Sequence, residues 1–221
     1  MLFNLIRGGM DFESLLIHIA VVFLMIFLIL PVHEFAHAGV AYLLGDKSIK
    51  YRNRLSLNPL KHIDITGALC MLLLGFGWAK AVPIYPGNFK KPKLYMGITA
   101  LAGPVSNILC GMLGGAIALL YIHTTTAEFF YSALGGFIWN FLAYYISINC
   151  SLAVFNLIPI PPLDGSRVLS IFLPDRAVNF IYRYEKYSFF IVILLSFTGV
   201  LDFIMDIFTP FLVKLCFFFT I

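Results

Sequence analysis

Three long stretches free of lysine and arginine, Leu15–Leu44, Leu94–Ile122 and Ser132–Leu157, constrain this chain most strongly. Each is longer than the roughly 20 apolar residues that a helix needs to cross a hydrocarbon core of about 30 Å. Only 12% of the residues are charged and 61% are hydrophobic, a composition outside the range of soluble globular domains. The sequence therefore predicts an all-α polytopic membrane protein.

Two further apolar runs are less regular. Ile65 to Trp78 is interrupted by glycine, which favours a re-entrant or hairpin segment after the first core helix. The run Tyr187–Phe219 is interrupted at Gly199 to Asp202, and either one tilted span with a tail or two spans in a hairpin would fit. Counting these runs, we expect a bundle of about 4–6 transmembrane helices.

The positive charges lie between the spans. Of the 15 lysines and arginines, 13 fall within residues 46–93 and 167–186, whereas the loop at 123–131 has none. This asymmetry is a topology signal and not a nucleic-acid footprint, so we expect no nucleic-acid partner. The two basic segments should face the cytoplasm, which places the N-terminus outside.

The first span ends in an HExxH pattern, His33-Glu34-Phe35-Ala36-His37. On a helix the two histidines lie about 40° apart on one face, so both imidazoles can bind one metal ion. Charged side chains within a span cost about 2.5–3.5 kcal/mol unless they face a polar cavity or a metal. The pattern predicts a metal site; a helix end carrying polar residues at the membrane interface is the alternative.

Catalytic zinc usually has three protein ligands and an open fourth position. Asp164 is the candidate for the third ligand, because Pro159, Pro161 and Pro162 before it prevent regular helix. Unwound backbone at membrane depth is tolerated only where it is buried or lines a cavity. The alternative is a proline-rich loop that simply leaves the bilayer.

The pairing of HExxH with the stretch from Asn156 to Gly165 resembles the site-2 protease family of intramembrane zinc metalloproteases, of the compact prokaryotic type. Residues 58–64, 77–83 and 102–107 (NPLKHID, GWAKAVP and AGPVSN) are also similar to members of that family. The resemblance implies one Zn²⁺ per chain, held by His33, His37 and Asp164. Many members carry a PDZ domain or an extra leading span. We expect neither here, a difference that bears on substrate selection more than on chemistry.

Zinc chemistry suggests roles for other polar residues. Glu34 would act as the general base that takes a proton from the attacking water. Asn107 and Asn156 are candidates for hydrogen bonds to the substrate backbone or to the developing oxyanion, with interhelical hydrogen bonds as the alternative. For His62, beside Asp64, a solvated cytoplasmic loop is favoured over a second metal site.

We expect one membrane-embedded metalloprotease domain over residues 1–221, with a catalytic core at about 15–170 and C-terminal helices at 187–219. The predicted function is that of a zinc metalloendopeptidase, a hydrolase that cleaves in or near transmembrane segments of other proteins, such as membrane-tethered regulators or signal-peptide remnants. The expected setting is the cell membrane, in a multi-pass protein with its active site toward the cytoplasm. The lipid bilayer and a transmembrane substrate are the expected partners.

Substrate binding and alternative functions follow from the same residues. The segment Ile65 to Trp78 and the stretch through Pro86 could bind an extended substrate by strand addition, a hypothesis that proline at Leu72 would test. A membrane metal-binding or transport protein using the same His, Glu and Asp cluster is the alternative function. An inactive relative and the CAAX-processing type of intramembrane metalloprotease also stay open.

Overall fold

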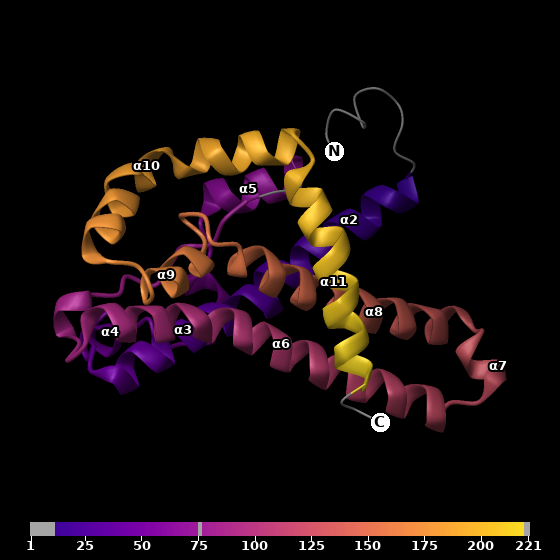
Figure 1. Ribbon diagram of the computed structural model, residues 1–221. Helices are drawn as coiled ribbons and strands as arrows, with labels where there is room; N and C mark the ends of the chain where they lie inside the picture. Colours follow the sequence, from indigo (N-terminus) through magenta and orange to yellow (C-terminus); the bar gives the residue numbers. More distant parts are fainter. Residues whose placement is uncertain (1–11, 75–76, 219–221) are drawn as a thin grey trace.

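The computed structural model describes residues 12–74 and 77–218, which are helical with irregular connections (Figure 1). No strand occurs in these described residues, so the predicted all-helical membrane bundle is confirmed. Three helices in this part of the chain are long and apolar enough to cross a membrane: Ile19–Leu44, Pro92–Thr124 and Ala133–Leu157. A fourth span is possible if the bent pair Phe190–Phe197 and Val200–Phe217 counts as one.

The first span consists of α2 (Phe12–Leu24), a π-helical turn (Met25–Ile29) and α3 (Leu30–Leu44). Pro31 has no N–H to donate back into the preceding turn, and the wider π turn directly before α3 accommodates this missing hydrogen bond. Gly45 ends α3 with a φ of 125°, a conformation that favours glycine.

Helix α6 (Pro92–Thr124) lies at the centre of the bundle, in contact with α3, with α8 (Ala133–Leu157), with α9 (Asp164–Ser170) and with α11 (Val200–Phe218). Its glycines allow this close packing. A Cβ at Gly115 would lie 2.7 Å from the carbonyl oxygen of Cys216 on α11. A Cβ at Gly114 would lie 2.9 Å from the Ile146 side chain on α8.

The segment between α3 and α6 contains α4 (Ser48–Tyr51), a 3-10 turn (Pro59–Lys61), α5 (Ile65–Leu74) and a second 3-10 turn (Pro86–Asn88). After α5 the chain doubles back and passes close to the start of the helix. A Cβ at Gly67 would lie only 2.0 Å from the Trp78 carbonyl oxygen. The predicted hairpin is therefore present. The expectation that Ile65 to Trp78 offers a strand edge is wrong for α5, whose backbone N–H groups are used within the helix.

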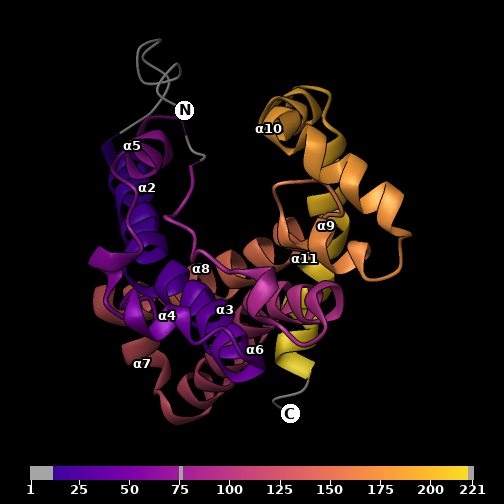
Figure 2. The same ribbon diagram turned by 90° about the vertical axis from the view of Figure 1, so that its left-hand side faces the viewer.

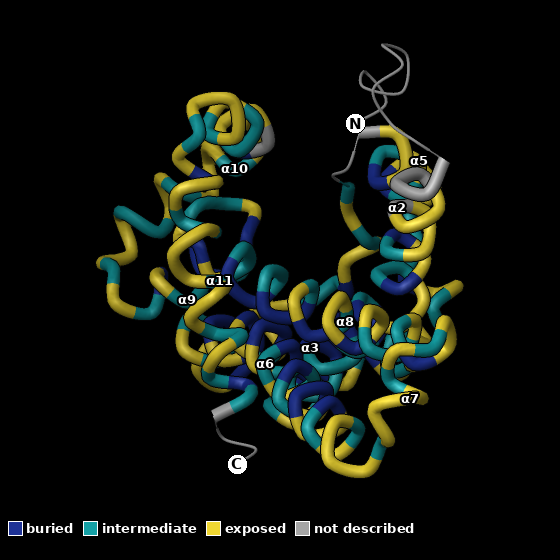
Figure 3. The backbone as a smooth tube through the Cα atoms, turned by 90° about the vertical axis from the view of Figure 1, so that its right-hand side faces the viewer, coloured by how far each residue is buried: buried dark blue, intermediate teal, exposed yellow. Residues whose placement is uncertain are grey.

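The last run, Tyr187–Phe219, is divided between α10 (Asp175–Phe197) and α11, which meet at Gly199 with a bend of 81°. Helix α10 begins 12 residues before the predicted start, within the second basic segment. A short helix, α7 (Ala127–Phe130), joins α6 to α8. Figures 2 and 3 show α2 and α5 on one side of the molecule and α10 on the other, with α3, α6 and α8 between them. The bend lies at the predicted interruption, and the bent pair fits either one broken span or a re-entrant loop.

Candidate metal centre

Helix α3 carries the HExxH residues on its buried side, where it packs against α6. His33, Glu34 and His37 are only 4%, 8% and 6% exposed. Ala38 and Ala41, on the same helix, are fully buried. Both belong to an apolar cluster that includes Val82 and, on α6, Met96.

Asp164 begins α9, directly after an irregular segment that follows α8. Gly165 keeps this helix start close to the end of α8, because a Cβ there would lie 2.2 Å from the Leu157 carbonyl oxygen. Ile158 and Leu163, at the two ends of the irregular segment, are buried. The predicted unwound segment is present; its ends are buried, Pro159 and Pro162 are exposed, and Pro162 also lines the cavity beside the candidate ligands. The segment brings Asp164 back to α3.

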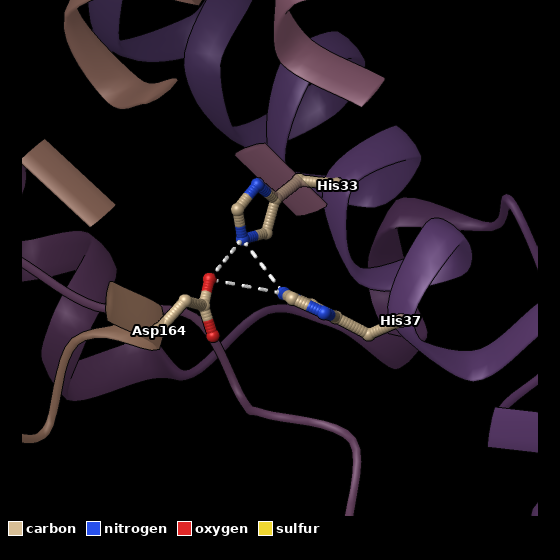
Figure 4. A group of neighbouring side chains, drawn as sticks. All are labelled: His33, His37 and Asp164. Carbon is tan, nitrogen blue, oxygen red and sulfur yellow. Dashed lines mark hydrogen bonds and ion pairs between the residues drawn. The ribbon is translucent and has the colours of Figure 1, made fainter. Parts of the chain in front are cut away.

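Figure 4 shows His33, His37 and Asp164 converging on one point. The two Nε2 atoms are 3.0 Å apart, and Asp164 Oδ2 lies 3.4 Å from His33 Nε2 and 3.2 Å from His37 Nε2. Tetrahedral zinc with ligand distances of 2.0–2.1 Å separates its ligand atoms by about 3.3 Å. The three side chains therefore form a triangle of the size that zinc requires.

The far nitrogen of each imidazole has its own partner. His37 Nδ1 lies 2.8 Å from the carbonyl oxygen of Thr99, and His33 Nδ1 lies 2.5 Å from Asn107 Oδ1. Both partners are acceptors, so each Nδ1 donates and each Nε2 keeps a lone pair. Two lone pairs and a carboxylate oxygen repel one another at 3.0–3.4 Å unless a cation, a proton or a metal ion, lies between them.

Gly103 on α6 leaves the space that such an ion and its ligands need. A Cβ at this position would lie 2.3 Å from His37 Nε2 and 2.6 Å from His33 Nε2. The backbone of α6 thus passes directly behind the two metal-facing nitrogens. Among the described residues, His33, His37 and Asp164 form the single cluster of histidine, cysteine and acidic side chains that could hold a metal ion.

Glu34 lies beside this triangle without belonging to it. Its Oε2 accepts a hydrogen bond of 3.0 Å from the backbone N–H of Val82, in the chain that returns from α5. Glu34 and the three candidate ligands line a cavity of ≈ 560 Å³, together with apolar side chains such as Met71. A carboxylate held next to the metal position and open to a cavity can exchange a proton with a water there.

The two predicted asparagines lie in different surroundings. Asn156 lines the cavity and donates through Nδ2 to the Leu152 carbonyl oxygen at 3.0 Å. Asn107 is fully buried behind His33, and its Nδ2 donates to Asn149 Oδ1 at 3.0 Å. The geometry at Asn107 favours the alternative interpretation, an interhelical hydrogen bond, and its role at an oxyanion stays a prediction.

His62 is not on a solvated loop, and that interpretation is wrong. The residue is 2% exposed, and its Nε2 lies 2.7 Å from the Ser56 carbonyl oxygen. Asp64 accepts from the Gly67 N–H and so caps α5. The fold encloses His62 between the polar loop and the first span, which its charged sequence neighbours did not indicate.

Asp46 is a structural residue that the sequence analysis did not single out. It is completely buried after α3 and accepts hydrogen bonds from Ser48, from the Tyr85 N–H and from Asn88. Burial opposes its ionisation, but these donors outweigh that effect and hold the pKa of the carboxyl below its ordinary 3.8. Asp46 thereby ties the cavity wall near Val82 to the helix that carries His33 and His37. The sequence did hold one indication of this role, because Asp46 directly follows Gly45, the glycine that ends α3.

Residues 21–198 match peptidase family M50. The relatives include "Putative zinc metalloprotease YwhC" of Bacillus subtilis, 38% identical over 166 residues that cover 75% of each chain. "Putative zinc metalloprotease Rip2" of Mycolicibacterium smegmatis is 29% identical, with 78% of this chain and 65% of the relative covered. The Mycobacterium tuberculosis protein of the same name is 28% identical, and the alignment covers 63% of this chain and 52% of the relative. No solved structure gives a significant match.

Proposed function

The chain belongs to peptidase family M50, the site-2 protease family of zinc metalloproteases, and from this premise we propose that it cleaves peptide bonds within or beside the membrane spans of other proteins. One observation carries the proposal. Three metal-binding side chains converge in a cavity within the bundle, with the carboxylate of Glu34 beside them.

His33, His37 and Asp164 would hold one Zn²⁺, and their donor set fits the His₂-carboxylate sites of catalytic zinc. When bound, zinc lowers the pKa of a coordinated water toward about 7 and polarises a substrate carbonyl. Glu34 would take the proton of the attacking water and pass it to the leaving amine. The hydrogen bond from Val82 holds the carboxylate in place while it does so.

The intramembrane location of the reaction rests on the position of the ligands. His33 and His37 lie within the apolar helix Ile19–Leu44, and Asn156 and Phe155 line the cavity from the end of another span. The basic residues of the segment after α3 support an active site toward the cytoplasmic side of the cell membrane. Membrane-tethered regulators and signal-peptide remnants are suitable substrates, because both present an apolar segment at that depth.

Residues 79–85 are the part of the α5–α6 connection that could still bind an extended substrate. The N–H groups of Lys80 and Val82 donate to the His62 carbonyl and to Glu34. Ala79 and Ala81 alternate with them and line the cavity. A peptide paired along this edge would place its scissile bond next to the candidate ligands. Ala81→Pro removes the backbone N–H of Ala81, a donor on this edge that a paired peptide would use, so we expect reduced cleavage with zinc retained. Unchanged cleavage would refute this binding mode.

The central test compares wild type with Glu34→Gln in detergent, using a model membrane-tethered substrate and measuring zinc content in both proteins. Glu128→Gln, an exposed glutamate on α7, is the matched control. We expect Glu34→Gln to retain zinc and to lose cleavage by at least a factor of about 100, in the range of general-base effects. Bound zinc without cleavage by wild type, across varied substrates, would instead favour a metal-binding or transport role.

A further inference from the structure

Asn149 has a buried side-chain amide that plays no part in the proposed reaction. It lies on α8, which packs along α6 near the metal centre (Figure 1). The residue is 1% exposed, and a buried amide costs free energy unless it is hydrogen bonded. Its Nδ2 donates to the Tyr145 carbonyl oxygen at 2.9 Å, and its Oδ1 accepts from Asn107 Nδ2 at 3.0 Å.

The direction of these hydrogen bonds is determined by chemistry. A backbone carbonyl only accepts, so the Asn149 atom that faces Tyr145 must be Nδ2. The other atom, Oδ1, also only accepts, so Asn107 turns its own Nδ2 toward it. Asn107 is then left with Oδ1 facing His33 Nδ1 at 2.5 Å, and this acceptor requires the proton on Nδ1. The lone pair of His33 is thereby kept on Nε2, which faces His37 and Asp164.

We propose that Asn149 is a positioning residue of the metal centre, which acts through Asn107 to hold His33 in the tautomer that can bind a metal ion. The inference rests on the proposed metal site. His37 needs no such relay, because the backbone carbonyl of Thr99 sets its tautomer directly. Only one of the two histidines depends on side chains from neighbouring helices for its metal-binding form.

Loss of the acceptor at position 149 frees the Asn107 amide to rotate. In the rotated form Nδ2 faces His33 and favours the tautomer with a proton on Nε2, which leaves no lone pair on the nitrogen that faces His37 and Asp164. Loss of a hydrogen-bond partner of a metal ligand typically weakens metal binding 10–100-fold. Asn149 is one residue further from the metal, so we expect zinc binding to weaken about 10-fold, at the lower end of that range.

The test is a zinc titration of chelator-stripped protein in detergent, against a competing chelator. We expect Asn149→Leu to bind zinc about 10-fold more weakly than wild type. Asn149→Asp should bind like wild type, because its carboxyl oxygen accepts from Asn107 whether or not the acid is protonated. Asn140→Leu makes the same change at an exposed position of α8 and should have no effect. Asn149→Ala repeats the test with a smaller side chain if the leucine variant does not fold.

A second background separates the relay from packing. In Asn107→Asp both carboxylate oxygens accept, so His33 no longer needs Asn149, and adding Asn149→Leu should leave zinc affinity unchanged. An equal loss in both backgrounds would give Asn149 a packing role and overturn the inference, as would wild-type affinity in Asn149→Leu alone. Absence of zinc binding by wild type would instead refute the proposed function itself.

Discussion

Replacing Gly103 by alanine should remove the metal site and leave the bundle folded. The added Cβ would lie 2.3 Å from His37 Nε2, 2.5 Å from His33 Cε1 and 2.6 Å from His33 Nε2. Ordinary contact begins at 3.4 Å, so a histidine must move by 3.4 − 2.3 = 1.1 Å. Metal sites tolerate only about 0.2 Å in ligand distance. The displacement is several times that tolerance.

The atoms in the way are the ends of imidazole side chains, so the histidines can swing aside with little cost to the backbone. Alanine also favours a helix over glycine by about 1 kcal/mol, which offsets part of an overpacking cost of about 1–3 kcal/mol. We therefore expect zinc affinity to fall by at least about 100-fold, or roughly 2.7 kcal/mol, while metal-free stability changes by less than about 2 kcal/mol.

The assay pairs a zinc competition titration with thermal unfolding of the stripped protein in detergent. Gly136→Ala, on α8, is the control, because a Cβ there meets nothing within 4 Å. That variant should bind zinc like wild type. Zinc affinity of Gly103→Ala within threefold of wild type would refute the geometry on which the metal centre is built.

Three further measurements follow from the structure. Because the pKa of Asp46 is lowered in the fold, its stabilisation is fully present above the ordinary value of 3.8 and is lost as the pH falls through the folded value. Asp46→Asn should lower the free energy of unfolding by about 1–3 kcal/mol at pH 7. Its stability should also fall less on acidification than that of wild type, as measured by unfolding across pH; the same pH dependence in both proteins would contradict this. Gly165→Ala should separate the start of α9 from α8 and reduce zinc content, since its Cβ would overlap the Leu157 carbonyl; full zinc occupancy would contradict the close approach. Zinc at 100 times its dissociation constant should stabilise wild type by about 2.7 kcal/mol. Asp164→Asn should abolish that gain in a thermal shift assay, and an unchanged gain would show that Asp164 is not a ligand.

The spans and the histidine pair were accessible from the sequence because both depend on local order along the chain. The length of an apolar run decides whether a helix can cross the membrane, and residues four apart share a face in any helix. The spacing of His33 and His37 therefore predicts, without knowledge of the fold, that both side chains point the same way. The prolines before Asp164 likewise predicted unwound backbone from their own chemistry.

Tertiary structure decided which distant groups meet. Asp164 is 127 residues from His37, and the contact of Gly165 with Leu157 helps to set where its carboxylate lies. The partner of Asn107 and the burial of His62 depend on how helices and loops pack, and no spacing within the sequence encodes either. Helix α5 lies in contact with α2, although the same apolar run had suggested a strand edge. Local patterns specify which groups a helix face presents, whereas only the packing of distant segments specifies which groups stand opposite them.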